Sequence, residues 1–114
     1  MTVLARWLRA LGKLRFRALG LATIKDIRTE QFNHLAKQLV AGGWRKTSEY
    51  EGFDAWIDYG RIRMRKNAVR LTLEWDNWTE GSIEGPRTVV ENIAREASLC
   101  VSYEWRWAEY DEPR

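Results

Sequence analysis

The sequence predicts a single α+β domain: an antiparallel β-meander of about five strands, two or three helices on one face, and a final strand after the last helix. Three observations lead to this prediction. The stretch from Phe53 to Trp78 alternates apolar and polar residues with the period of two that half-buried strands show. Other stretches repeat apolar residues at helical spacing. The chain has 114 residues, a length that suits one modest hydrophobic core.

An amphipathic basic helix is predicted from Val3 to about Leu19, with an apolar side that includes Leu11 and Leu14. Its opposite side carries the basic residues Arg6, Arg9, Lys13 and Arg17. Such a helix would pack on its own domain or on a second copy, contact an anionic membrane surface, bind nucleic-acid phosphates or act as a targeting presequence. The sequence leaves these alternatives open.

Basic charge is concentrated at the N-terminus. The whole chain has 19 basic and 16 acidic residues and a formal net charge of +3, but its first 25 residues hold six bases and no acid. The remainder, with 13 bases and 16 acids, therefore has a net charge of −3. We divide the chain into a basic arm at 1–22, one α+β domain at 23–110 and an acidic tail at 111–114. The positive total charge therefore predicts binding of polyanions only through the arm, because the rest of the chain is mildly acidic.

A second helix is predicted from residue 29 or 30 to Ala41, because apolar residues recur from Phe32 at i, i+3, i+4, i+7 and i+8. Thr29 is the expected N-cap, and Gly42-Gly43 ends the helix. His34 falls beside the apolar stripe, so we expect it at the surface.

Four strands are predicted next, at residues 44–50, 53–59, 62–66 and 69–75. A two-residue turn at Gly60-Arg61 suits glycine, which adopts a positive φ angle without steric cost. After Trp75 we expect an odd-length loop, because it keeps Ile83 on the same face as Leu71. The following strand, Thr79 to Glu84, has the weakest pattern.

These turns fix a register between neighbouring strands. The turn at Gly60-Arg61 would set Asp58 opposite Arg63 and Trp56 opposite Arg65. A turn at Asn67-Ala68 would set Arg65 opposite Arg70, a misfit of like charge. It would also form three favourable pairs: Met64 with Leu71, Ile62 with Leu73, and Arg61 with Glu74.

A third helix is predicted from Pro86, whose missing N–H costs nothing at the first helical position, to about Ser98. The final strand, Val101 to Trp107, should lie parallel to the strand before that helix and at or beside a sheet edge. Between them, Cys100 is expected to be a small buried apolar residue. A single cysteine cannot form an internal disulfide, which favours a cytoplasmic location. The apolar run at residues 18–24 is short and interrupted, so neither a secretory signal nor a transmembrane segment is expected.

The sequence offers no motif for catalysis. It contains no glycine-rich phosphate loop, nucleophile elbow or cysteine motif, and its one histidine has no partner at metal-ligand spacing. Four carboxylates, Asp54, Asp58, Glu74 and Glu80, share the predicted polar face. They alternate with arginines, a pattern more typical of an ion ladder on a solvated sheet than of acid/base chemistry. We therefore expect a non-enzymatic protein without cofactor or metal.

Tryptophan and arginine suggest how the protein would bind a partner. The chain has seven tryptophans, and these two residue types are enriched at interface hot spots. Strand parity places Trp56 on the polar face with Arg63, Arg65 and Arg70, and Trp78 in the turn at its edge. We expect a small module that binds a protein partner, or itself as a homodimer, through this face, the basic arm or both. The alternative is a protein that binds nucleic acid or an anionic membrane surface through the arm and the arginine-rich face.

Overall fold

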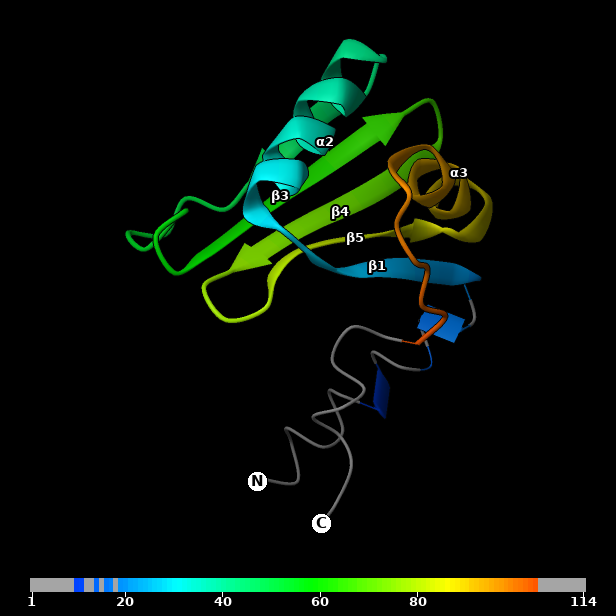
Figure 1. Cartoon of the computed structure of the whole chain (residues 1–114), viewed down its shortest axis with the longest axis horizontal. Helices are drawn as coiled ribbons and strands as arrows, with labels where there is room; N and C mark the ends of the chain where they lie inside the picture. Colours follow the sequence, from blue (N-terminus) through cyan, green and yellow to red (C-terminus); the bar gives the residue numbers. More distant parts are fainter. Residues whose placement is uncertain (1–9, 12–13, 15, 18, 105–114) are drawn as a thin grey trace.

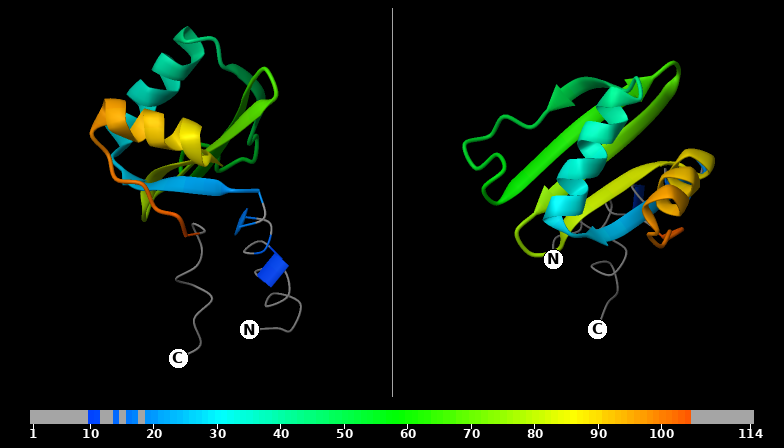
Figure 2. Two further views of the ribbon diagram at one scale, coloured as in Figure 1. Left: turned by 90° about the vertical axis from the view of Figure 1, so that its right-hand side faces the viewer. Right: turned by 45° about the horizontal axis from the view of Figure 1, so that its top comes forward.

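Five antiparallel strands form one sheet in the computed structural model of the chain, which describes residues 10–11, 14, 16–17 and 19–104 (Figure 1). They are β1 (Leu21–Ile27), β2 (Arg45–Glu49), β3 (Tyr59–Lys66), β4 (Val69–Asp76) and β5 (Glu80–Pro86), in the spatial order β1-β5-β4-β3-β2. In the described part of the chain, the helices α2 (Thr29–Ala41) and α3 (Arg87–Ala97) lie on one face of this sheet (Figure 2). The predicted α+β class is confirmed.

The hydrophobic core fills the space between the two helices and the sheet. In β3, β4 and β5 the period-two pattern sends the core residues to the helix side. In β1 a register shift between Ile24 and Ile27 breaks this pattern, and Ile27 is buried with Ala22 and Ile24. The buried cluster consists of Ala22, Ile24, Ile27, Phe32, Leu35, Ile62, Met64, Leu71, Leu73, Ile83, Val90 and Ala94.

The hairpin of β3 and β4 has the predicted register. Met64 pairs with Leu71, and Arg65 lies opposite Arg70. The turn is tight because Asn67 takes the positive φ angle, 55°, which asparagine tolerates better than most residues. The predicted odd-length loop between β4 and β5, residues 77–79, is also confirmed.

The strand predicted at 53–59 is wrong. Residues 51–58 form a loop, and β2 pairs directly with β3, with Glu49 opposite Ile62 and a register shift between Lys46 and Ser48. The predicted turn at Gly60-Arg61 therefore lies inside β3. Consequently Asp58 does not face Arg63.

Trp56 gives the physical reason for this loop. It adopts a positive φ angle of 62°, far from the φ of about −140° that a regular antiparallel strand requires. Its ring packs against Phe32 of α2, with the ring centroids 6.4 Å apart. The side chain that was expected on the polar face thus folds back toward the helices.

The strand β1 was not predicted. It pairs antiparallel with β5, with Leu21 opposite Pro86 and Ile24 opposite Ile83. On its other side, the backbone of Thr23 exchanges two hydrogen bonds with Ser102, of 2.8 and 2.7 Å. This isolated antiparallel bridge gives the chain at Ser102 the direction of β5, as predicted for the final strand. Residues 105–107 of that strand lie outside the described residues.

The helices begin close to the predicted positions. Arg28, rather than Thr29, is the N-cap of α2, and it provides no side-chain cap. The Thr29 N–H instead donates to Glu80 of β5, at 3.1 Å. Pro86 ends β5 and is the N-cap of α3, which begins at Arg87.

Two single-residue predictions have different outcomes. His34 is exposed, as predicted. The prediction that Cys100 is buried is wrong, because Leu99 and Val101 on either side pack against the core and turn Cys100 outward. No helix within the described ranges is long and apolar enough to cross a membrane.

The described residues of the basic arm at 10–11, 14 and 16–17 are helical. Phe16 is buried, whereas Leu11, Leu14 and Arg17 are exposed. Leu11 and Leu14, two residues of the predicted apolar side, are thus largely open to solvent. Three arm residues, Arg6, Arg9 and Lys13, and the tail at 111–114 lie outside the described residues.

Candidate functional site

The sheet face turned away from α2 and α3 carries three of the predicted site residues. On the side of β1 and β5, Thr23 and Ser82 of this face are buried. On the side of β2, β3 and β4, the predicted residues Arg63, Arg65 and Arg70 are exposed. This half of the face is therefore open to a partner.

The strand register aligns three arginines in one row across the sheet. Arg45 of β2 lies opposite Arg65 of β3, and Arg65 lies opposite Arg70 of β4. Residues directly opposite one another point to the same face, with Cβ atoms about 5 Å apart. Arg63 lies on the same face, two residues along β3. We call these four residues, Arg45, Arg63, Arg65 and Arg70, the arginine surface.

The arginine surface is not neutralised by the described acids. All four residues are exposed, and no described carboxylate lies within ion-pairing distance of their guanidinium groups. The ion pair that does form between described residues joins Lys46 to Glu49, at 3.6 Å. Arg65 Nε donates to the carbonyl oxygen of Asn67, at 2.7 Å. The ion ladder predicted for Arg45, Arg63 and Arg70 is therefore wrong.

The four carboxylates of the predicted polar face hold loops and turns in place. Each accepts a hydrogen bond. Glu74 accepts from the Tyr59 hydroxyl (2.8 Å), Asp54 from the Tyr50 hydroxyl (2.6 Å), Asp58 from the Asn77 amide (2.7 Å) and Glu80 from the Thr29 hydroxyl (3.0 Å). The bond to Asp54 raises the pKa of Tyr50 above its ordinary value. Among the described residues, no three histidine, cysteine or acidic side chains are placed to hold a metal ion.

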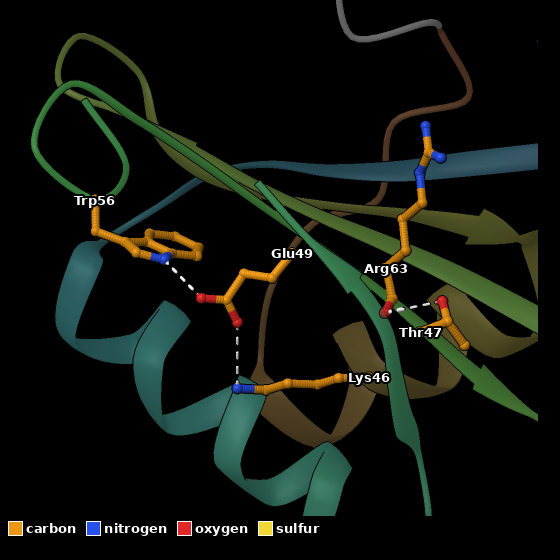
Figure 3. Close-up of polar contacts among 5 residues, drawn as sticks. All are labelled: Lys46, Thr47, Glu49, Trp56 and Arg63. Atoms are coloured by element: carbon orange, nitrogen blue, oxygen red, sulfur yellow. Dashed lines mark hydrogen bonds and ion pairs between the residues drawn. The ribbon is translucent and has the colours of Figure 1, made fainter. Parts of the chain in front are cut away.

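Trp56 does not join the arginine surface. It is 37% exposed, and its Nε1 donates to Glu49 Oε2 at 3.1 Å. Figure 3 shows Trp56 and Glu49 on the side of α2, while the Arg63 side chain points away from that helix. The predicted grouping of Trp56 with the arginines is wrong, because it depended on a hairpin that does not form.

Trp78 lies at the other end of β4 from Arg70, in the loop before β5. It is 78% exposed, and in the loop at 51–58 Phe53 and Ile57 are 100% and 64% exposed. The two loops are joined where Asn77 donates two hydrogen bonds to Asp58, from its amide side chain (2.7 Å) and its backbone N–H (3.2 Å). We call Phe53, Ile57 and Trp78 the apolar tip.

Two parts of these surfaces were missed from the sequence. The strand wrongly predicted at 53–59 would lie between the strands that hold Arg45 and Arg65, so these two arginines were not recognised as neighbours. Phe53 and Ile57 were assigned to the predicted strand at 53–59, which does not form. Their sequence signal was the loop composition around Gly52, which the alternation of apolar residues outweighed.

A groove of about 390 Å³ separates α2 from α3. It is lined by Leu35 and Leu39 of α2, Val89 and Ile93 of α3, and Trp44. Its polar residues are Gln38, Asn92 and Glu96, which lie on the helices rather than in the sheet beneath.

Comparisons of the chain with protein-family models, curated proteins and solved structures found no match. The surfaces described above are therefore the basis for a functional proposal.

Proposed function

We propose that this protein is a small non-enzymatic interaction module that binds an acidic segment of a protein partner through the arginine surface. The observation that carries this proposal is the row Arg45–Arg65–Arg70, which is exposed and has no described carboxylate within ion-pairing distance. Each directly opposed pair of like charges destabilises a sheet by about 0.2–1 kcal/mol. Carboxylates of a partner would offset this repulsion on binding. A cytoplasmic location fits the single, exposed Cys100.

The spacing of the arginines suits an extended acidic segment. Arginine binds a carboxylate through two parallel N–H···O bonds. Arg63 and Arg65 lie two residues apart on one strand, which corresponds to about 7 Å. A partner in β conformation presents every second side chain at the same interval. A segment with acids at alternate positions would therefore meet both arginines at once.

One feature favours an acidic protein segment over nucleic acid. Proteins that bind single strands stack bases on aromatic side chains, and Trp56 lies on the other side of the sheet from the arginines.

Fluorescence anisotropy with two peptides tests the proposal. One alternates glutamate with threonine, and the other has the same composition with its glutamates in one block. We expect the full chain to prefer the alternating peptide and Arg65→Glu to weaken that binding about tenfold or more. The control Arg28→Glu changes the same charge at an exposed arginine before α2 and should leave the affinity within about twofold.

Three results would overturn the proposal. In the first, neither peptide binds at physiological salt. In the second, Arg28→Glu weakens binding as much as Arg65→Glu, which would mean that net charge alone attracts the peptide. In the third, a single-stranded oligonucleotide binds more tightly than both peptides and loses that affinity in Arg65→Glu. This last result would identify the arginine surface as a nucleic-acid site.

A further inference from the structure

The apolar tip exposes three large hydrophobic side chains to solvent. Phe53 and Trp78 are among the most exposed large side chains of the described residues, and Ile57 lies in the same loop as Phe53. Hydrogen bonds between Asn77 and Asp58 hold the two loops together. Clustered exposed aromatic and aliphatic side chains mark interaction sites in soluble proteins.

The charge around the apolar tip restricts what it would bind. Residues 49–58 contain four acids and no lysine or arginine, and residues 76–80 contain two acids and no base. This negative charge disfavours an anionic membrane surface, nucleic acid and another copy of the tip itself. A complementary partner is apolar and positively charged.

The chain itself contains a segment of this chemistry. The basic arm, residues 1–22, has five basic residues and no acid. Its described part is helical, and Leu11 and Leu14 are 53% and 62% exposed. Residues three apart are neighbours on a helix surface, so these two leucines form an apolar side that would fit a hydrophobic partner surface.

The described part of the arm does not cover the tip of its own copy. Both the leucines and the tip residues are exposed, so they do not cover one another. The arm joins β1 at Leu21, opposite Pro86, whereas the tip lies near the other end of the seven-residue strand, about 20 Å away. Figure 1 shows the described part of the arm beside the end of β1 that is remote from the loops at 51–58 and 77–79.

We propose that the apolar tip of one copy binds the Leu11–Leu14 side of the basic arm of a second copy. The two surfaces in this contact differ, so the contact is heterologous and would link copies into a closed ring or a longer chain. The inference uses neither the arginine surface nor an acidic partner, and therefore it stands or falls separately from the proposed function.

Sedimentation velocity on two complementary full-length variants tests this contact. Phe53→Ser with Trp78→Ser disables the tip, and Leu11→Glu with Leu14→Glu disables the arm. Wild-type protein should associate more as its concentration rises, and each variant alone should be monomeric. An equimolar mixture of the variants should form a one-to-one dimer, because one intact tip then meets one intact arm. The control Val40→Ser removes another exposed apolar side chain, on α2, and should associate like wild type.

The mixing experiment also gives results that would overturn the inference. A wild-type chain that stays monomeric at every concentration would overturn it, and so would two variants that remain separate when mixed. Circular dichroism would show whether the double variants are folded. If either is not, the single variants Trp78→Ser and Leu14→Glu replace them, each expected to weaken association about tenfold. Binding of the acidic peptide by the tip variant should be unchanged.

Discussion

The indole ring of Trp56 occupies the space that a side chain at Gly60 would need. A β-carbon on Gly60 would lie 2.1 Å from a ring carbon of Trp56, far inside contact distance. The same ring tilts against Phe32 and donates a hydrogen bond to Glu49. The Trp56 ring packs over Gly60 of β3 and thereby fixes the loop at 51–58 against the sheet.

Gly60→Ala should destabilise the fold by about 1–3 kcal/mol, because the added methyl group overpacks the Trp56 ring. In a Trp56→Ala background the same change should cost much less, since the space is then free. Urea unfolding of the four proteins in this cycle measures the coupling, expected at about 0.5–3 kcal/mol. Additive costs would show that Trp56 does not pack on Gly60 in solution.

Arg65→Glu should stabilise the fold while it weakens partner binding. It replaces repulsion with Arg45 and Arg70 by attraction, at about 0.2–1 kcal/mol for each pair. Salt screens such repulsion, so wild-type stability should rise with salt more than that of the variant. Thermal unfolding at two salt concentrations measures both effects. The control Lys37→Glu, on the exposed side of α2, should change stability little. Equal destabilisation by both substitutions would contradict the register.

Glu80 has two opposing effects that different substitutions should separate. Its φ angle of 59° is strained for any residue but glycine. Its carboxylate accepts bonds from the Thr29 N–H and hydroxyl, and that hydroxyl accepts one from Trp75 Nε1 at 2.9 Å. Glu80→Ala loses the bonds and keeps the strain, so it should cost about 1.5–3 kcal/mol. Glu80→Gly should be about 1 kcal/mol more stable than Glu80→Ala. Chemical denaturation of the two variants measures the difference, and equal stabilities would rule out strain at this position.

The bond from Tyr50 to Asp54 should make the fold sensitive to alkaline pH. That bond raises the pKa of Tyr50 above 10.0, because only the protonated phenol can donate it. A group whose pKa is higher in the folded than in the unfolded state stabilises the fold at every pH below its unfolded-state pKa. This stabilisation is lost as the pH rises through its folded-state pKa. Tyr50→Phe should therefore be less stable than wild type at neutral pH, and the gap should shrink above pH 10. Urea unfolding of both proteins at neutral pH and above pH 10 measures the difference in their free energies of unfolding. A difference that stays the same at both pH values would contradict the prediction.

The sequence predicted those parts of the fold that local signals determine. The hairpin of β3 and β4 has a two-residue turn and regular alternation, so its register, including the clash of Arg65 with Arg70, was predictable. The loop at 51–58 also alternates, but contacts of Trp56 with Phe32 and Gly60 prevent a strand, and none of these is a local signal. β1 was missed because its partner, β5, lies far along the chain and its register shifts between Ile24 and Ile27.

The candidate site was predicted to the same extent, and for the same reason. Arg63, Arg65 and Arg70 belong to the predictable hairpin and were placed together correctly. Arg45, Phe53 and Ile57 depend on the path of the chain before Tyr59, where the predicted register failed. The sequence of this chain therefore predicts which surface residues of the regular strands lie together. It does not predict this for the surface residues of the loop at 51–58.

The pairing of β1 with β5 also determines when the protein can fold during its synthesis. Leu21–Ile27 emerges from the ribosome early, but its partner, Glu80–Pro86, is translated only near the end of the domain. Until then, Ile24, Ile27 and the apolar side of α2 lack the strand and helix that bury them in the finished structure. Pairing between distant segments slows folding and prolongs the exposure of such surfaces. The nascent chain is thus most vulnerable to aggregation before its last strand and α3 leave the ribosome.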